Sequence, residues 1–521
     1  MKTRLSFILF LVVLSFASCK KYLDVKPTDF TTPETFYETA KDLDQALTGI
    51  YSSLNNTGTY SRNLVFDLAF GTDEAFYKRS TPQVDPIVYN NDGSNSTVTA
   101  TWSSLYAGIN NANLLLANID RPVMDEASRS RIKGEALFLR AFLYFQLVHL
   151  WGDVPLILTP TLSGINVKHI RTPQKEVYEQ ILGDMKTAEG LVGNITEFVP
   201  VGSGRVSKTA VQGILARVCL KMAGAPLNDL SKFEEARMWS NKVIESGVHR
   251  LNPDYAQIFI NLTQDKYDIG ESIWEVEIAG NGLTNPVLGG GWFAKKLSVR
   301  NTSAELYGYG EVGANGTLYR RYNDIHDVRR DRNIATYYFP VITSSMLKDT
   351  LAHAPSVLYN RDTGKWRIQE EISGSRNANA GPTNFPLLRY ADVLLMYAEA
   401  ENEINGPTPA AFAALNQVRS RAKARVFTIA DAADKNSFRS IIQDERSREL
   451  CYEATRKFDL IRWGIFINVM KDVENDILSN APSNLQYSAV GYSNVKARNL
   501  LLPIPTLELS LNSLMRQNPG F

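Results

Sequence analysis

Three aromatic residues beside glycines in the middle of the chain are the first candidates for binding chemistry. Trp292 follows the glycines at 289–291, and Tyr307 and Tyr309 flank Gly308. A ring on a glycine-rich loop is hard to bury, and it offers a flat apolar face with a polar group at its edge. These residue types at this spacing indicate binding of a ligand rather than catalysis.

A loop nearer the N-terminus supplies further polar and aromatic side chains. It runs from Asp73 to Trp102 and includes Tyr77. Trp102 also opens an apolar stretch of helical period, so packing in the core is the alternative for this residue. The predicted ligand-binding residues are Trp292, Tyr307, Tyr309, Trp102, Tyr77 and Asp73.

Catalytic and metal-binding motifs are weak throughout the sequence. Residues 308–313 spell a dinucleotide fingerprint, but the loop residues at 314–316 follow where a helix is needed to hold the pyrophosphate. The five histidines are never four residues apart, as a zinc-binding pair on a helix would be. Adjacent carboxylates such as Asp73/Glu74 and Glu370/Glu371 leave a glycosidase open as an alternative. We predict no catalytic residue, no metal site, no cofactor and no enzymatic activity.

The charge balance gives no reason to expect nucleic acid as a partner. The sequence holds 56 Lys and Arg against 55 Asp and Glu, a net charge of +1. Such a chain has no general field to attract phosphate backbones. Cys219 and Cys451 lie in apolar helical patterns, which predicts buried and unreactive thiols.

The first nineteen residues indicate export and lipidation. Lys2 and Arg4 precede an apolar run over 5–16, and the small residues at 17–18 stand directly before Cys19. The run is shorter than the ~20 residues that span a bilayer, and the pattern is typical of a signal peptide. Small residues before a cysteine resemble a bacterial lipobox, so we predict a signal peptide over 1–18 and a lipid anchor on Cys19. An ordinary secretory peptide with an incidental cysteine is the alternative.

Helical patterns that come in pairs are expected to position these side chains. The predicted pairs are 134–151 with 177–192, 207–223 with 233–246, 387–404 with 409–424, and 438–452 with 455–473. Repeated hairpins of this size are typical of tetratricopeptide-type repeats, and an irregular helical domain is the alternative. Glycine-rich loops dominate 271–384, and apolar alternation there predicts short strands. The predicted fold is therefore mainly α, with tetratricopeptide-like helical hairpins in an N-terminal part over 19–270 and in a C-terminal part over 271–521. The C-terminal part also holds a loop-rich insertion at 271–384 with short strands.

The segment from Asp444 to Arg462 is dense in charge. Asp444 with Arg448, and Glu453 with Lys457, are acids placed four residues before a base. On an exposed helix each such pair contributes only ~0.2–0.5 kcal/mol. We expect a solvated or ion-paired helical face here.

Several segments taken together resemble the SusD/RagB family. They follow one another in family order across essentially the whole chain: 22–24 with Pro27, 138–141 with 152–156, 388–400, Glu445-Arg446 through Glu449, Glu453, Arg456, Asp459 and 462–464, and the terminal 502–505 with 517–521.

This resemblance implies a surface-exposed outer-membrane lipoprotein with a tetratricopeptide-like helical frame and an irregular ligand-binding region. Proteins of the family capture an oligosaccharide and pass it to a SusC-like TonB-dependent transporter, and they are not enzymes. Sugar rings have apolar C–H faces that stack on Trp and Tyr, while Asn, Asp and Arg bond their hydroxyls. The expected partners are therefore the transporter, an oligosaccharide, and the outer membrane through Cys19. The alternatives are a lipid-anchored repeat scaffold that binds only proteins, and a surface glycosidase.

Overall fold

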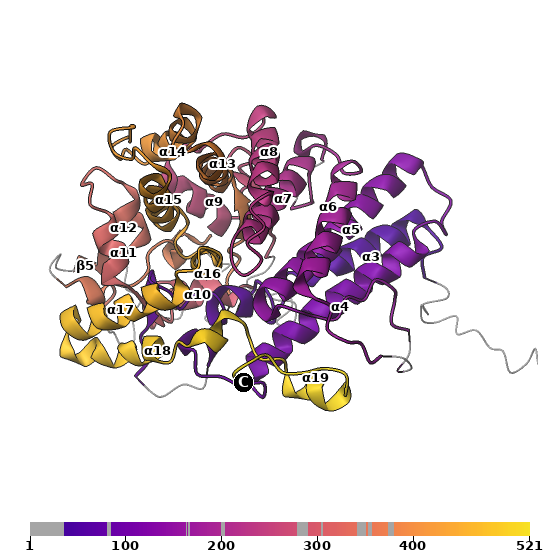
Figure 1. Cartoon of the computed structure of the whole chain (residues 1–521), viewed down its shortest axis with the longest axis horizontal. Coiled ribbons are helices and arrows are strands. Elements are labelled where there is room, and N and C mark those ends of the chain that lie inside the picture. The colour runs from indigo at the N-terminus through magenta and orange to yellow at the C-terminus, as the bar shows by residue number, and fades with distance from the viewer. Residues whose placement is uncertain are drawn as a thin grey trace, which may run out of the picture.

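The structure is a computed structural model. It describes residues 36–80, 85–162, 164, 167–198, 204–278, 290–303, 306–340, 351–352, 357–372 and 380–521. Most of the described chain is helical, and the helices form an arc that runs in Figure 1 from α3 and α4 on the right, over α7 and α8, to α13 and α14 at the upper left.

The arc is a series of helices in which each packs on the next. Its members are α3 (Ala40–Ser52), α4 (Ser96–Asn118), α5 (Glu126–Trp151), α6 (Gln174–Glu189), α7 (Lys208–Ala223), α8 (Lys232–Glu245), α13 (Tyr390–Asn405), α14 (Pro409–Arg421) and α15 (Lys435–Leu450). Neighbours contact in the order α3 to α8, then α8 with α13, and α13 with both α14 and α15. The 134–151 part of α5 is buried on all sides, as its apolar sequence predicts. The mainly helical fold of paired helices is thus confirmed.

Side chains at the N-termini fix where several of these helices begin. Thr39 and Asp42 form a capping box on α3, Ser207 accepts a hydrogen bond from the amide of Ala210 on α7, and Thr408 precedes Pro409 at the start of α14. Such caps satisfy amides that have no partner within the helix.

Shorter elements fill the left, the centre and the bottom of Figure 1. They are α9 (Tyr255–Thr263), α10 (Trp292–Leu297), α11 (Gly316–Arg321), α12 (Arg329–Asn333), α16 (Arg456–Arg462), α17 (Phe466–Asn480), α18 (Val490–Ser493) and α19 (Thr506–Leu511). The strands within the described residues make three two-stranded antiparallel sheets: β1 (Ala75–Tyr77) with β3 (Val312–Ala314), β2 (Ser272–Val276) with β6 (Phe385–Arg389), and β4 (Tyr337–Tyr338) with β5 (Leu351–Ala352). The short strands predicted for the insertion are therefore present.

Three predicted element boundaries are wrong. Residues 387–389, assigned above to a helix, end strand β6, and α13 begins only at Tyr390. The helix predicted over 455–473 is broken into α16 and α17 at Gly464, whose φ of 72° lies in the left-handed region that glycine favours. The loop predicted from Asp73 to Trp102 contains β1 and the first turns of α4.

The charged segment Asp444 to Arg462 is mostly buried and ion-paired, so of the two expected alternatives the ion-paired face is found and the solvated face is wrong. Glu445 and Glu449 lie fully inside, and the pair expected between Glu453 and Lys457 is replaced by bonds from Lys365 and Arg389 to Glu453. Asp444 and Arg448 do approach, at 3.7 Å. Although burial raises the pKa of Glu445, the arginines around it lower that pKa to about 2.

Cys219 and Cys451 are buried free thiols, as predicted, and burial raises the pKa of each to about 12.

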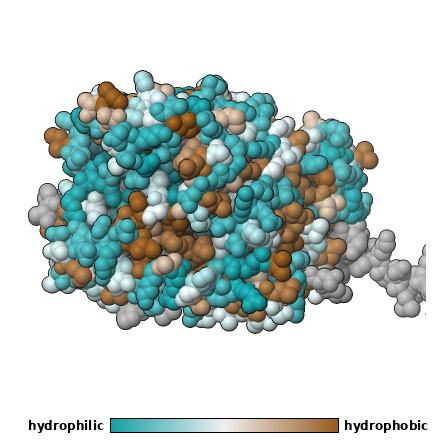
Figure 2. Space-filling model, in the orientation of Figure 1, coloured by the Kyte–Doolittle hydropathy of each residue, from teal (hydrophilic) through white to brown (hydrophobic). Residues whose placement is uncertain are grey.

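Among the described residues, no helix combines the length and the apolar character needed to cross a membrane. The face seen in Figure 2 is largely hydrophilic, with hydrophobic residues gathered near its centre.

Candidate ligand-binding site

Trp292, Tyr307 and Tyr309 lie together in the structure. The rings of Trp292 and Tyr309 are stacked, with centroids 6.3 Å apart and planes at 23°. Tyr307 meets Tyr309 edge to face, with centroids 5.1 Å apart. All three side chains are half-buried, so part of each ring faces solvent. We call these three rings the aromatic platform.

Backbone contacts hold the platform in place. The amides of Trp292 and Phe293 donate to the carbonyl of Ser61 at 2.9 and 3.1 Å, which docks the start of α10 on the segment before residues 63–67. Gly308 exchanges two 3.0 Å hydrogen bonds with Asn301. A Cβ at Gly308 would lie only 2.4 Å from Ser298 Oγ, so the backbone between the two tyrosines has room for glycine alone.

Lys296 joins the platform to Tyr77. Its ammonium lies 4.9 Å from the ring centroids of both Tyr309 and Phe66, and it donates to Glu311 at 2.7 Å. Phe66 in turn meets Tyr77 edge on, with centroids 6.4 Å apart. Attraction between a buried cation and aromatic faces adds rigidity to such a cluster. Four of the six predicted ligand-binding residues therefore belong to one continuous cluster.

Two arginines lie at the margin of this cluster. Arg79, half exposed at 52%, pairs with Glu311, and Arg62 Nε lies 3.0 Å from Asp67. Burial raises the pKa of Asp67 to about 6, although Arg62 opposes the shift. Guanidinium groups beside partly exposed rings can donate to hydroxyl groups of a ligand that lies across the platform.

Asp73 lies outside the cluster, in the interior of the protein. Its side chain is fully buried and accepts hydrogen bonds from Arg321 at 2.6 Å and from Arg456 at 2.8 and 2.9 Å. These two arginines hold the pKa of Asp73 well below its usual range, against the effect of burial. With both oxygens engaged, the carboxylate has a structural role and is not part of the proposed site.

Trp102 also lies apart from the platform. It sits on α4, is 4% exposed, and packs edge on against Trp151 at 5.2 Å between centroids. This is the core position that its helical apolar pattern allowed. One edge lines a separate hollow of about 380 Å³, next to Tyr106 and Glu508.

Sequence reasoning missed the groups that connect the platform. Lys296 and Phe66 carry no local signal, because their role depends on contact between segments 230 residues apart. Arg79 was predictable, since it lies two residues after Tyr77 in the predicted loop. Cys19 lies outside the described residues, so its predicted lipid anchor stays a prediction.

Comparison with protein families gives two matches. The model of the SusD family matches residues 344–521, and a model described as "Starch-binding associating with outer membrane" matches residues 21–220.

Known relatives and solved structures align with nearly the whole chain. SusD-like protein P25 of Formosa agariphila is 30% identical over 97% of this chain and 96% of its own. The crystal structure of a SusD homolog from Bacteroides thetaiotaomicron, 26% identical, superposes with a TM-score of 0.85 over 94% of this chain and 98% of that one. A laminarin-binding SusD-like protein, 22% identical, has the same fold with a TM-score of 0.71 over 93% of this chain and 100% of its own. This chain is therefore a SusD-like protein and belongs to the SusD/RagB family along its whole length.

Proposed function

We propose that this chain is a surface lipoprotein that binds an oligosaccharide at the aromatic platform and delivers it to a SusC-like TonB-dependent transporter for import. The observation that carries the proposal is the grouping of three half-exposed rings, Trp292, Tyr307 and Tyr309, with Arg62 and Arg79 at the margin. The matched family is described as starch-binding, and a relative of the same fold binds laminarin, which supports a glycan as the ligand.

The platform suits a sugar chain for geometric reasons. Trp292 and Tyr309 present nearly parallel rings, whereas Tyr307 stands almost perpendicular at 86°. Rings in two orientations can meet the C–H faces of successive sugar units in a curved chain. The tyrosine hydroxyls and the two arginines then supply hydrogen bonds to sugar hydroxyls. Such a site binds and releases its ligand without changing it.

The carboxylate pairs considered for glycoside hydrolysis are engaged in ion pairs, which supports a binding protein over a glycosidase. Asp73 is held by two arginines, as described above. Glu370 accepts from Arg332 at 2.6 and 2.7 Å, and Glu371 accepts from Lys295 at 2.8 Å. A general acid and a nucleophile must instead be free to reach a substrate.

Anchoring and transport complete the proposal. A diacylated Cys19 would hold the protein at the outer membrane, because two buried chains are needed for stable anchoring. A large polar ligand cannot cross that membrane without a pore, which supports a transporter as the partner. The net charge of +1 favours docking by shape and local patches over long-range attraction. A scaffold that binds only proteins would have little use for exposed rings in the insertion.

Trp292→Ala tests the platform. Loss of one stacking ring should weaken binding by about 1–3 kcal/mol, by analogy with bases stacked on aromatic side chains. This corresponds to a rise of about five- to 150-fold in the dissociation constant. Isothermal titration with laminari- and malto-oligosaccharides would measure the effect.

The matched control is Tyr338→Ala, which removes a 38% exposed ring from the same insertion but outside the platform. It should bind as the wild type does. If Trp292→Ala stays within twofold of the wild type while its circular dichroism is unchanged, the platform is not the binding site.

A further inference from the structure

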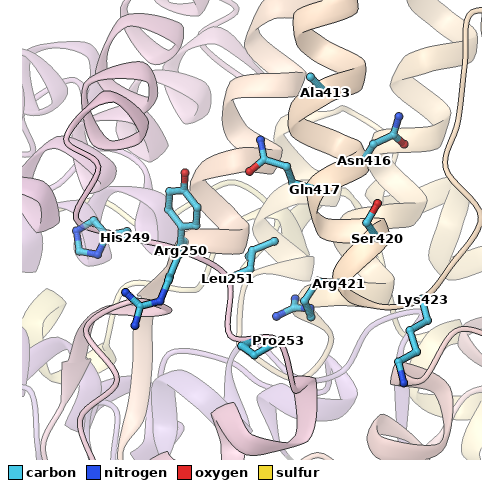
Figure 3. Close-up of a pocket in the computed structure, with 11 residues that line it drawn as sticks. His249, Arg250, Leu251, Pro253, Ala413, Asn416, Gln417, Ser420, Arg421 and Lys423 are labelled. Carbon is cyan, nitrogen blue, oxygen red and sulfur yellow. The ribbon is translucent and has the colours of Figure 1, made fainter.

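A second concave site lies on the helical frame, between α14 and the chain segment 249–253. Figure 3 shows the segment on one side and the side chains of α14 and its C-terminus on the other, with Arg250 and Lys423 at opposite sides of the opening. The hollow has a volume of about 730 Å³, within the range of small-molecule sites. We call it the α14 groove.

Several polar side chains in this groove have hydrogen-bonding capacity to spare. Within the described residues, no partner is found for the Arg250 guanidinium, the Gln417 amide, the Ser420 hydroxyl, the Lys423 ammonium or the Tyr390 hydroxyl. The neighbouring Arg421 side chain is 97% buried, and its Nε also lacks a partner. An unpartnered buried donor is costly, and here it lies at the wall of an open hollow.

The charge of the groove is positive. Behind the wall, Glu271 and Glu449 are shared between Arg421 and Arg389. Asp268, beside the stem of Arg250, accepts from Asn252 and the amide of Gly270. Asp324, which lines a neighbouring hollow with Lys423, accepts from the amides of His326 and Arg425, so among the described residues no acid forms an ion pair with Arg250 or Lys423. His249 bonds Thr209 and the carbonyl of Ile269, and burial lowers its pKa, which leaves it neutral.

These cations are not needed to cap α14. The amides of Ala422, Lys423 and Ala424 already donate to the carbonyls of Val418, Ser420 and Arg419 at 3.0–3.1 Å. The backbone itself thus satisfies the C-terminal carbonyls. Arg250, which comes from a different segment, has no such role at all.

The remaining walls are mostly apolar, formed by Leu251, Pro253, Ala413 and the ring of Tyr390. The one further polar side chain in the lining, Asn416, is taken up by two hydrogen bonds to the backbone of Phe427. A site that joins apolar surface, neutral hydrogen-bonding groups and two separated cations fits a ligand with C–H faces, hydroxyls and two anionic groups.

We propose that the α14 groove binds an acidic saccharide, with one carboxylate or sulfate group at Arg250 and another at Lys423. The hydroxyls of Tyr390 and Ser420 and the amide of Gln417 bond the sugar hydroxyls between them. The choice of a saccharide rests on the proposed function, whereas the charge and length of the ligand rest on the groove itself. Because the two cations stand apart, an acidic trisaccharide binds better than the corresponding single sugar.

The test is isothermal titration of the full mature chain with trigalacturonate for carboxylate, a sulfated chondroitin oligosaccharide for sulfate, and maltotriose as the neutral probe. In the double variant Arg250→Ala/Lys423→Ala, affinity for the acidic probe should fall at least tenfold. The control Lys41→Ala/Lys175→Ala removes the same charge from exposed sites on α3 and α6 and should bind as the wild type does.

The outcomes separate this inference from the proposed function. If the acidic saccharide still binds to Trp292→Ala but not to the groove variant, the groove proposal is supported, whether or not neutral glycans bind. Loss of neutral-glycan binding in Trp292→Ala alone supports the platform. The groove proposal is overturned if neither acidic probe binds, if the groove variant binds as the wild type does, or if triglutamate peptide binds as tightly as the acidic saccharides.

Discussion

Replacing Arg389 should lower the stability of the helical frame more than replacing any other single residue. Its side chain is 1% exposed and reaches three glutamates: Glu271 at 2.8 Å, Glu449 at 3.0 Å, and Glu453 through two bonds of 2.8 Å. It is also the last residue of β6 and directly precedes α13, so it ties a sheet to two helices. We predict that Arg389→Met strongly destabilises the protein without changing its overall volume much.

The size of the stability loss depends on which basic partners the three glutamates keep after Arg389 is replaced. Removing one partner of a buried ion pair typically costs about 3–5 kcal/mol, because the other charge stays buried. Here each acid retains a second base: Lys365 for Glu453, Arg421 for Glu271, and both Arg421 and Arg329 for Glu449. The loss should therefore fall near the lower end, about 3 kcal/mol in the free energy of unfolding.

Urea unfolding followed by circular dichroism would measure this loss, since urea leaves ion pairs unscreened while guanidinium chloride would not. The matched control is Arg425→Met, whose side chain is 61% exposed and pairs with Asp431 at 2.8 Å. Solvent screens an exposed pair, so this variant should unfold close to the wild type. A difference of less than about 1 kcal/mol between the two variants would refute the view that the buried pairs hold the frame.

Three further predictions concern acid stability, the lipid anchor and the transporter. Nearby arginines lower the pKa of Asp392 and of Glu445 to about 2, from ordinary values of 3.8 and 4.5, although burial acts in the other direction. Their contribution to stability is complete above the ordinary pKa and is lost as the pH falls toward 2. Carboxyls whose pKa is raised by burial, such as Asp67 at about 6, act in the opposite direction only at higher pH, so the comparison is made below it. Urea midpoints should drop steeply from pH 4.5 to pH 2.5, and equal midpoints at these two values would contradict this. Cys19→Ala should move the protein from the membrane fraction to the soluble one, and unchanged fractionation would contradict the predicted lipid anchor. The wild type in mild detergent should co-purify with a barrel protein, and recovery of the wild type alone would count against a transporter as its partner.

The long helices were predictable because their signals are local. The helix predicted over 207–223 is α7 at 208–223, and the helix over 233–246 is α8 at 232–245. Both combine a regular apolar period with polar residues at the N-terminus. Strand β6 was missed because a short run that is buried throughout has no period to distinguish it from a buried helix.

The site was predictable only where sequence neighbours carry the information. Glycines beside Trp292 and Tyr309 signal an irregular backbone that leaves rings partly exposed, and these residues do lie together. Asp73 looked like a loop acid because its partner Arg456 is 383 residues away. The local sequence of a loop cannot reveal an ion pair between residues so far apart along the chain.

The same contrast explains why the family is easier to recognise than its ligand. The charged residues of the signature segments pair with one another inside the frame: Arg446 with Asp392 and Asp459 at 2.7 and 2.8 Å, Arg462 with Glu399, and Arg389 with Glu449 and Glu453. A buried charge depends on a partner of opposite sign, so replacing one residue alone leaves its partner unpaired at a high cost. Trp292 and Tyr307 are only half-buried, so at the proposed binding site we expect a change to alter what is bound without unfolding the frame. The signatures therefore report how the helices are held together, and the ligand must be read from the loops that those helices carry.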